Sequence, residues 1–438
     1  MTAKYDATSV DSIVGYAHAL TGKTLNEVVT LPHQVENAKN KGDLGGLVEA
    51  HFFDLPKTNS DLDFPAASLE LKTTGVKKRS DGRYQAKERL VLTMINFMDL
   101  VGESWLTSNF YKKCKLMLIL FYLYEKDVPV FDQRFVLPPF LYKLDEHDAA
   151  TIKQDWEYIK QKVADGKAHE LSEGDTFYLG ACRKGAGGPD EPLRKQPFSS
   201  EGAKARAFSF KTNYLNALIE GHASSSNGLS REGKTIYEAT QERFEPYLGL
   251  SLEEISNRIG YFKSGPNHKG FVRDLMTRVL ARGGSSVPEL DRAGIEMKTI
   301  RLNKNGVPKE HMSFPGFKFT EIVEEEWEQS SFFEKLESKF LFIVFQEDRA
   351  GIERFRQALY WNMPYEDRLE AKRVWEDTKN RVQNAVSIMP KASESYVAHV
   401  RPKGRDGTDK IITPHGSFQM KQCFWLNAKY LEQVLTNN

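Results

Sequence analysis

The stretch SDLDFPAASLELKTTGVKK, residues 60–78, contains a charged segment inside an otherwise apolar strand. Leu69 and Leu71 alternate with Glu70 and Lys72, and alternate side chains of a strand lie on opposite faces. The two leucines are therefore predicted to point into the core. Glu70 and Lys72 are predicted to project side by side on the other face.

The segment FPAAS, immediately before this strand, is typical of a turn. Pro65 interrupts a continuous strand, so a short bend can bring the carboxylate of Asp63 back beside Glu70. Two converging carboxylates need a positive partner, and Mg²⁺ prefers carboxylate oxygens while keeping positions for water and phosphate. Lys72 would then stand beside metal-bound water. This combination suits phosphodiester hydrolysis, because the metal stabilises charge on phosphate and the ammonium positions the attacking water.

The preceding segment GDLGGLVEAHFFDL, from Gly42, is predicted to be a short helix. Its apolar positions form one stripe, which leaves Glu49 at the edge of the stripe, where it can face the same site. The stripe consists of Leu44, Leu47, Val48, Phe52 and Leu55.

An acidic residue two positions before a lysine is common by chance, and an exposed pair of Glu70 and Lys72 has the alternative interpretation of a surface ion pair. That alternative leaves the upstream Asp63, the nearby Glu49 and the repetition of the pattern unexplained.

Length and composition set the wider frame. The chain has 438 residues and 40% hydrophobic content, enough for two domains with separate cores. Its 61 basic and 60 acidic residues give a net charge of +1, so overall charge predicts no class of partner. The cysteines Cys114, Cys182 and Cys423 are widely spaced, which favours buried packing residues in a reducing compartment. No apolar run is long enough to span a membrane, so the sequence predicts a cytoplasmic protein with no membrane partner.

The two halves of the chain repeat one another. The offsets between matching segments stay between 216 and 226 residues, which indicates a tandem duplication. The matching pairs include ASLELKTTGVKK from Ala67 with AGIEMKTIRLNK from Ala293, SNFYKKCKLMLILFYLYE from Ser108 with SFFEKLESKFLFIVFQED from Ser331, IKQDWEYIKQKV from Ile152 with AKRVWEDTKNRV from Ala371, and ARAFSFKTNYLNALI from Ala205 with KQCFWLNAKYLEQVL from Lys421.

Each copy is predicted to run from a helix through the charged strand and further strands to a helix centred on Trp156 or Trp375, a basic loop and a closing helix. That order predicts an α/β fold in which a mixed sheet is flanked by helices. The Ser- and Gly-rich segment EGHASSSNGLSREG, residues 220–233, is typical of a linker between the copies.

The spacing of Glu49, Asp63, Glu70 and Lys72, with the sequence DFPAASLELKT, resembles the active-site segment of the MutH family of GATC nickases in mismatch repair. It is the PD-(D/E)xK nuclease pattern. The segments ERLVLTMINF, IKQDWEYI, GKAHELSEG, QPFSS and KARAFSFKTNY are more similar to the staphylococcal-type GATC restriction endonucleases, which are duplicated MutH-like proteins. The resemblance covers nearly the whole chain.

This resemblance implies two tandem restriction-endonuclease-like domains, a catalytic nuclease domain at 1–220 and a degenerate DNA-binding or effector domain at 234–438, joined by a linker at 221–233. In the first domain Asp63 and Glu70 would bind Mg²⁺, with Glu49 as a further metal-site carboxylate, and Lys72 would serve the attacking water.

The resemblance also places a base-reading loop at CRKGAGG, from Cys182, where Lys184 matches a lysine of the family loop. MutH has an arginine where Cys182 stands, and Arg183 follows it, so which side chain reads which base stays open. The basic stretch that follows favours a phosphate-contacting surface, with a solvated charged face as the alternative. The DNA-binding candidates here are Arg183, Lys184, Lys204, Arg206, Lys211 and Tyr214, the last equally compatible with packing in the core.

The second copy departs from the pattern. Glu296 and Lys298 persist, Glu289 is predicted to replace Asp63, and the position of Glu49 falls at or near Arg273, beside Asp274. An arginine would repel a metal ion, so this copy is expected to bind DNA without cutting it, with cleavage by both halves as the alternative. Its DNA-binding candidates lie in HVRPKGRDG, from His399, and are Arg401, Lys403 and Arg405.

The resulting hypothesis is a Mg²⁺-dependent type II restriction endonuclease for double-stranded DNA, with GATC as the expected palindrome and the second copy as an effector that binds a second site. The alternatives are a MutH-like mismatch-repair nickase and a noncatalytic sequence-specific DNA-binding protein. A DNA-induced dimer is compatible with the hypothesis. A cognate DNA methyltransferase would belong to the same restriction-modification system, with no direct contact implied.

Overall fold

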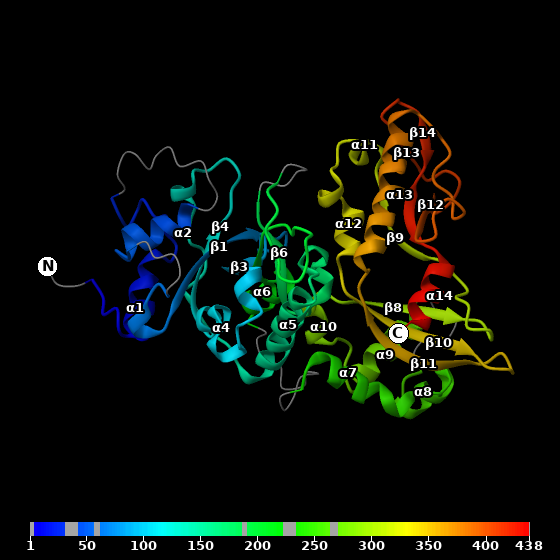
Figure 1. Cartoon of the computed structure of the whole chain (residues 1–438), viewed down its shortest axis with the longest axis horizontal. Coiled ribbons are helices and arrows are strands. Elements are labelled where there is room, and N and C mark those ends of the chain that lie inside the picture. The colour runs from blue at the N-terminus through cyan, green and yellow to red at the C-terminus, as the bar shows by residue number, and fades with distance from the viewer. Residues whose placement is uncertain are drawn as a thin grey trace. The chain divides into compact units, whose positions relative to one another are not determined.

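The computed structural model describes residues 4–30, 43–56, 62–185, 191–221, 234–262 and 270–437. These residues form two compact units (Figure 1). The first unit comprises the described residues to His169, those from Thr176 to 221, and Lys234, while Glu170–Asp175 and the residues from Thr235 onward belong to the second. Apart from Gly221, the predicted linker lies outside the described residues, so the predicted domain limits stay a prediction.

The first unit contains seven strands and six α-helices among its described residues. The strands are β1 (Glu70–Lys78), β2 (Tyr84–Ala86), β3 (Leu90–Met94), β4 (Leu116–Leu123), β5 (Phe140–Lys143), β6 (Leu179–Arg183) and β7 (Arg206–Phe210). The helices are α1 (Val10–Ala17), α2 (Asp43–Leu47), which continues into a π-helical turn (Val48–Phe52), α3 (Phe97–Leu100), α4 (Asn109–Cys114), α5 (Glu146–Ala164) and α6 (Thr212–Ile219).

The strands of the first unit form two sheets. One has the order β2-β1-β4-β5, in which β1 and β4 are parallel and the other pairs antiparallel. Strand β4 is apolar along its whole length and buried on both faces, as is usual for a central strand beside a parallel neighbour. The other sheet is antiparallel, in the order β3-β7-β6.

The second unit contains eight strands and eight α-helices among its described residues. The strands are β8 (Glu296–Leu302), β9 (Met312–Phe317), β10 (Phe340–Glu347), β11 (Glu353–Trp361), β12 (Ala398–Pro402), β13 (Lys410–Ile412), β14 (Phe418–Met420) and β15 (Gln422–Leu426). The helices are α7 (Ile236–Phe244), α8 (Leu252–Ile259), α9 (Phe271–Leu280), α10 (Pro288–Ala293), α11 (Phe319–Ile322), α12 (Ser331–Leu336), α13 (Tyr365–Gln383) and α14 (Ala428–Thr436).

The second unit repeats the topology of the first. Its sheet β11-β10-β8 has the same parallel pair, with Glu296 opposite Phe340 as Glu70 is opposite Met117. Its antiparallel sheet β12-β15-β9 matches β6-β7-β3. The predicted tandem mixed α/β fold is therefore confirmed. The hairpin β13–β14 is an addition to this unit.

A serine fixes the same short helix in both units. Ser108 Oγ donates to the carbonyl of Trp105 at 2.8 Å and accepts the amide of Tyr111 at 3.0 Å, which caps α4. Ser330 Oγ makes the same two bonds, to Trp327 at 2.8 Å and from Phe333 at 3.1 Å, at the start of α12. Because the caps match, Lys113 on α4 and Lys335 on α12 occupy the same helical position.

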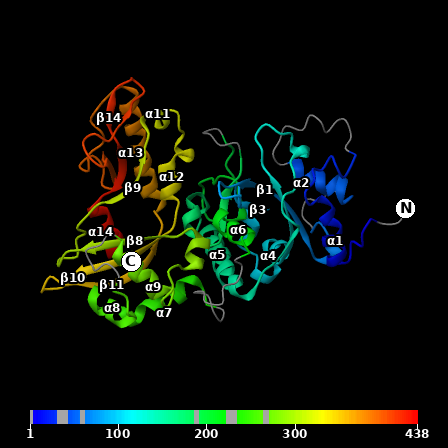
Figure 2. The ribbon, with the colours of Figure 1, turned by 180° about the vertical axis from the view of Figure 1, so that it is seen from behind.

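The leucine face of β1 is buried as predicted. Leu69 and Leu71 are 0% and 2% exposed and pack with β4 and with the helices α1 and α2, which lie on one side of this strand pair (Figure 1 and Figure 2). The three cysteines are buried and form no disulfide, as expected. No helix within the described ranges is long and apolar enough to cross a bilayer.

Candidate active site

The predicted turn before β1 is confirmed. Phe64 and Leu69 form an antiparallel bridge around the 3₁₀ turn Pro65–Ala67, and Ser68 closes it in the left-handed region at φ 51°. Asp63 Oδ2 accepts the backbone amide of Leu71 at 2.8 Å. This bond fixes the carboxylate of Asp63 against the beginning of the charged strand.

Glu70 is the most enclosed member of the site, with a side chain 2% exposed. Lys72 Nζ donates to its Oε1 at 2.6 Å. Burial of an ionised carboxylate is costly without a charged partner, so an exposed ion pair does not describe this contact. The face opposite the leucines is covered rather than open to solvent.

Lys113 is a site residue that the sequence interpretation missed. Its Nζ lies 3.1 Å and 3.4 Å from the two carboxylate oxygens of Glu70. The residue comes from α4, 41 positions after Lys72, so no local motif marks it. The signal available in the sequence was the repeat itself, because a lysine stands at the same place in the second copy, at Lys335.

Glu49 joins the same group of charges from the π-helical turn that follows α2. Its pKa is raised, first by burial and then by the negative charge of Asp63, with Glu70 acting in the same direction. The pKa of Asp63 is raised by burial and by Glu70, against the amide of Leu71. Lys72 and Lys113 oppose both shifts. We call these five residues, Glu49, Asp63, Glu70, Lys72 and Lys113, the first-unit centre.

The first-unit centre has the chemistry of a site for a hard cation. Three carboxylates interact electrostatically, and the pKa values of two of them are raised, first by burial and then by the neighbouring negative charge. In this arrangement the direct contacts of the Glu70 carboxylate are with two lysines. Among the described residues, no three acidic, histidine or cysteine side chains lie close enough together to hold a metal ion. The donor types fit Mg²⁺, and its binding would require Glu70 to exchange an ammonium contact for the metal.

Replacement of Lys113 by alanine should lower DNA cleavage by about one to two orders of magnitude, because displaced groups at a reacting centre cost about a hundredfold. Glu70 would lose one of its two ammonium partners and its fixed position. The measurement is the initial cleavage rate at saturating Mg²⁺. Lys112→Ala is the matched control, since Lys112 is exposed on the same helix and should change the rate by about twofold or less. Equal effects of the two substitutions would contradict a role for Lys113.

Two of the predicted DNA contacts in the first unit are wrong, because the residues are buried. Tyr214 is 1% exposed, donates to Asp148 Oδ2 at 2.8 Å and stacks on Tyr178. Arg206 is 3% exposed and donates from Nη1 to the carbonyl of Ala181 at 2.6 Å. Both side chains stabilise the interior of the unit.

Lys211 is also engaged within the fold. Its Nζ donates to the carbonyl of Thr176 at 2.6 Å and interacts with the buried Asp155. Burial raises the pKa of Asp155 to about 6, although Lys211 and three backbone amides at the start of β6 favour its charged form. Lys211 therefore has a role in the fold, and its contact with DNA stays a prediction.

The remaining basic candidates lie at the end of β6 and beyond it. Arg183 ends β6, and the amide of Lys184 continues the ladder by donating to Ala205 at 2.8 Å. Lys204 lies 3.9 Å from Glu191. The last part of the predicted base-reading loop, 186–188, lies outside the described residues. Contacts of Arg183, Lys184 and Lys204 with DNA stay a prediction.

The second unit preserves the charged strand but not its surroundings. Lys298 Nζ donates to Glu296 Oε1 at 2.6 Å, and Lys335 lies 3.7 Å from Oε2. Arg273, on α9, interacts with Glu296 electrostatically, where Glu49 acts on Glu70. The pKa of Glu296 is lowered because these three cations outweigh its burial. We call Arg273, Glu296, Lys298 and Lys335 the second-unit cluster.

The predicted replacement of Asp63 by Glu289 is wrong. Pro288 opens helix α10, as Pro65 opens the first-unit turn, and both segments end in a left-handed residue. Glu289 follows the proline, is 1% exposed and lies 3.8 Å from Arg292 inside the unit. Two positions before the proline, where the first unit has Asp63, the second has Ser286, which is exposed. The second unit thus lacks this carboxylate.

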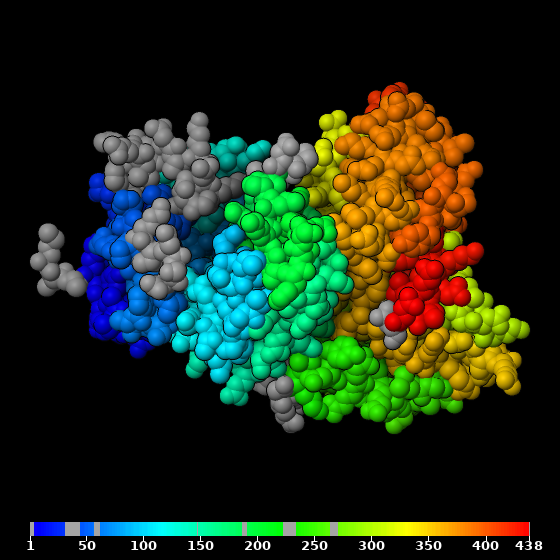
Figure 3. Space-filling view, viewed as in Figure 1, coloured from blue at the N-terminus to red at the C-terminus, as the bar shows by residue number. Residues whose placement is uncertain are grey.

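The basic candidates of the second unit are exposed. Arg401 and Lys403 belong to β12 and its end, and both cations lie over the ring of Trp425, at 5.1 Å and 5.8 Å from its centroid. Arg405 follows them and is 86% exposed at its side chain. The space-filling view shows an orange to orange-red surface, from α13 to β14, on the upper part of this unit (Figure 3). Their contact with DNA stays a prediction.

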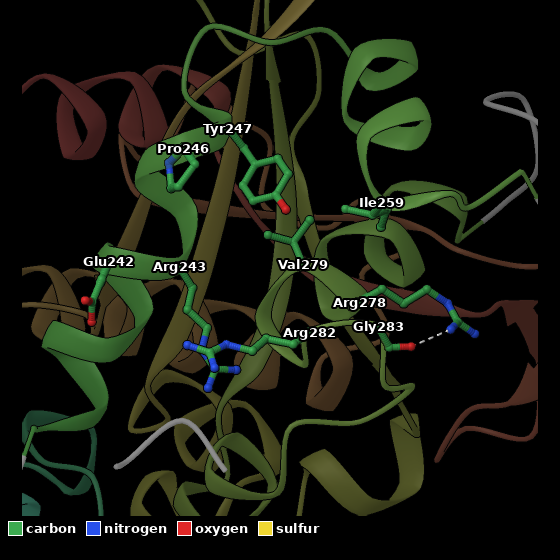
Figure 4. Close-up of a pocket in the computed structure, with 9 residues that line it drawn as sticks. All are labelled: Glu242, Arg243, Pro246, Tyr247, Ile259, Arg278, Val279, Arg282 and Gly283. Carbon is green, nitrogen blue, oxygen red and sulfur yellow. Dashed lines mark hydrogen bonds between the residues drawn. The ribbon is translucent and has the colours of Figure 1, made fainter. Parts of the chain in front are cut away.

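A cavity of about 460 Å³ lies in the second unit and contains none of the predicted site residues. Figure 4 shows the guanidinium groups of Arg243 and Arg282 next to each other, while Arg278 turns away and donates to the carbonyl of Gly283 at 2.9 Å. Arg243 also donates to the carbonyl of Leu280, at the end of α9. These contacts fix the turn after α9.

The comparisons with known proteins agree with this architecture. The family described as DNA mismatch repair enzyme MutH matches the chain twice, over residues 54–155 and 280–372. The first match contains Asp63, Glu70, Lys72 and Lys113, and the second contains most of the second-unit cluster. The chain belongs to the MutH family, with two copies of the family's fold in tandem.

Its relatives include both long and short members. The type II restriction enzyme Sau3AI of Staphylococcus aureus is 32% identical over 90% of this chain and 92% of its own length. The DNA mismatch repair protein MutH of Shewanella woodyi is 28% identical over 42% of this chain and 80% of its own, and that of Shigella flexneri is 26% identical over 49% and 93%. The match to Sau3AI extends over both units.

Proposed function

We propose that this protein is a type II restriction endonuclease that hydrolyses double-stranded DNA at GATC with Mg²⁺. The first unit cuts, and the second unit binds another recognition site as an allosteric effector. The observation that carries the proposal is the first-unit centre, in which three interacting carboxylates and two lysines stand at the beginning of β1. The similarity to Sau3AI along almost the whole chain favours restriction over repair.

The residues of the first-unit centre have separable roles in this proposal. Asp63 and Glu70 would bind Mg²⁺, and Glu49 would complete the acidic side of the site. When bound, the metal would stabilise charge on the phosphate and acidify its water. Lys72 would hold the attacking water in line with the leaving oxygen. Lys113 would hold the carboxylate of Glu70 in place.

A mismatch-repair nickase is the second candidate, since the shorter relatives are MutH proteins. Those relatives match only 42% and 49% of this chain over 80% and 93% of their own length. The second copy, which keeps the charged strand, therefore has no counterpart in the matched part of them. A noncatalytic DNA-binding protein is the third candidate, and the crowded carboxylates argue against it, because they weaken binding to a polyanion unless a cation neutralises them.

The same proposal places the protein in the cytoplasm beside a DNA methyltransferase that protects the host's sites, without a direct contact between the two. A DNA-induced dimer would let two first units cut the two strands of a palindrome.

Affinity for Mg²⁺ should rise with pH above the ordinary carboxylate range. Burial and mutual repulsion raise the pKa values of Asp63 and Glu49 from 3.8 and 4.5, and a protonated carboxyl does not bind the metal. Titration calorimetry with Mg²⁺ and no DNA, repeated over a pH series, measures this dependence. In the Glu49→Gln variant the dependence should weaken. An affinity that is constant through and above the carboxylate range would contradict the assignment of these groups to the metal.

The proposed function is tested with long unmethylated DNA, purified protein and Mg²⁺, followed by sequencing of the ends. We expect double-strand breaks confined to GATC and none in EDTA. Nicks restricted to hemimethylated sites would favour the repair nickase. Specific binding with no cleavage would favour the noncatalytic protein.

A further inference from the structure

The two units carry opposite charge at the same place in the fold. The first-unit centre combines three carboxylates with two lysines. In the second-unit cluster a single carboxylate, Glu296, interacts with three cations, Arg273, Lys298 and Lys335. Asp291, outside the cluster, interacts with Arg273 and with Glu289. A position that is formally negative in one unit is therefore formally positive in the other, although strand, register and capping serine are the same.

The second-unit cluster is also more accessible. The side chain of Glu296 is 38% exposed, against 2% for Glu70. Lys298 and Lys335 are 27% and 40% exposed, against 18% and 14% for Lys72 and Lys113. Arg273 is exposed as well. A ligand can thus reach these cations, whereas a metal ion would be repelled by them.

We propose that the second-unit cluster binds a backbone phosphate of duplex DNA directly, through Arg273, Lys298 and Lys335 and without a metal ion. This inference rests on the proposed function, in which the second unit binds a recognition site. In the proposed function, the first unit holds a DNA phosphate at the start of β1. If the second unit binds DNA in the same way, a backbone phosphate lies at the start of β8. In this structure the carboxylate of Glu296 contacts both lysines. A DNA phosphate would displace it.

The proposal is tested by DNA binding to the full chain in EDTA, where the net negative first-unit centre contributes least. Fluorescence anisotropy with a labelled GATC duplex is measured over a range of salt concentrations. Lys298→Ala should weaken binding about tenfold and reduce the slope of log K against log salt by about 1, as expected for one lost phosphate contact. Lys72→Ala, the same change at the matching position of the first unit, should alter affinity by less than about threefold.

Glu296→Gln gives a second result of opposite sign. Removal of the competing carboxylate should strengthen DNA binding in EDTA. The ratio of DNA affinity in Ca²⁺ to DNA affinity in EDTA should be the same in this variant as in the original chain. Glu70→Gln, the matched change, should abolish the Ca²⁺ dependence. Lys298→Arg should restore binding if charge rather than folding is responsible, and thermal unfolding of each variant identifies any folding defect.

Unchanged affinity and salt slope in both Lys298→Ala and Glu296→Gln would overturn the phosphate site. Loss of the Ca²⁺ dependence in Glu296→Gln would overturn it also, since the cluster would then bind metal. Cleavage of GATC by the original chain would leave the proposed function standing in either case. Absence of any Mg²⁺-dependent cleavage by that chain would instead refute the proposed function.

Discussion

Lys72→Ala should reduce DNA cleavage about a hundred- to a thousandfold while duplex affinity changes by less than about threefold, since loss of one preorganised donor costs about 10²- to 10³-fold and one contact among several costs little binding. Glu70 would still be neutralised by Lys113, whose Nζ lies 3.1 Å from its Oε1, so the fold of the first unit should persist. Single-turnover cleavage rates with Mg²⁺ and anisotropy with Ca²⁺ measure the two quantities on one preparation.

Lys112→Ala is the control for this experiment as well, because it removes the same charge from an exposed position on α4. Cleavage by Lys72→Ala at a tenth of the original rate or more would show that Lys72 does not serve the attacking water. Loss of cleavage together with loss of binding would make Lys72 a DNA contact rather than a catalytic residue.

Asp63→Asn should reduce the cleavage rate by a similar factor. It should also remove the stabilisation of the protein by Mg²⁺. An asparagine can still accept the amide of Leu71 through its carbonyl oxygen, so the turn before β1 should be preserved. It lacks the charge that binds a cation. The original protein should gain about 2.7 kcal/mol of unfolding free energy at a Mg²⁺ concentration of 100 times Kd, and the variant almost none.

The metal-free protein should respond in the opposite direction. The raised pKa of Asp63 means that ionisation of this group opposes folding, so the stability it contributes falls as pH rises through the folded pKa. The neutral asparagine should therefore leave the metal-free chain at least as stable as the original near neutral pH. Thermal unfolding with EDTA and with Mg²⁺ measures both effects. Asp127→Asn, at an exposed loop position, should change neither. A variant that keeps the Mg²⁺ shift would exclude Asp63 as a metal ligand.

The fold was predictable because duplication supplies each element twice. The charged strand is recognisable from the pair EMKT and ELKT, and the central strands β4 and β10 from their apolar runs. The turn at FPAAS was predictable from Pro65. These signals are local in sequence, and local backbone preferences produce them.

The errors have a common physical cause, which is burial that the sequence does not display. Tyr214 and Arg206 follow a basic loop and have the residue types of a DNA surface, but the packing of β6, β7 and α5 encloses them. Glu289 matched Asp63 in chemical type, yet the longer turn of α10 moves it inside the unit. Lys113 was missed because its contact with Glu70 joins residues 43 positions apart.

Only the first unit should cut DNA, with the charges of the first-unit centre. This division of roles is tested by end sequencing of long unmethylated DNA after digestion by the original chain, by Lys72→Ala and by Lys298→Ala. The original chain and Lys298→Ala should both yield ends at GATC, more slowly in the second, and Lys72→Ala should yield none. Ends at GATC from Lys72→Ala, or their loss in Lys298→Ala while binding to DNA persists, would contradict this division of roles and assign cleavage to the second unit.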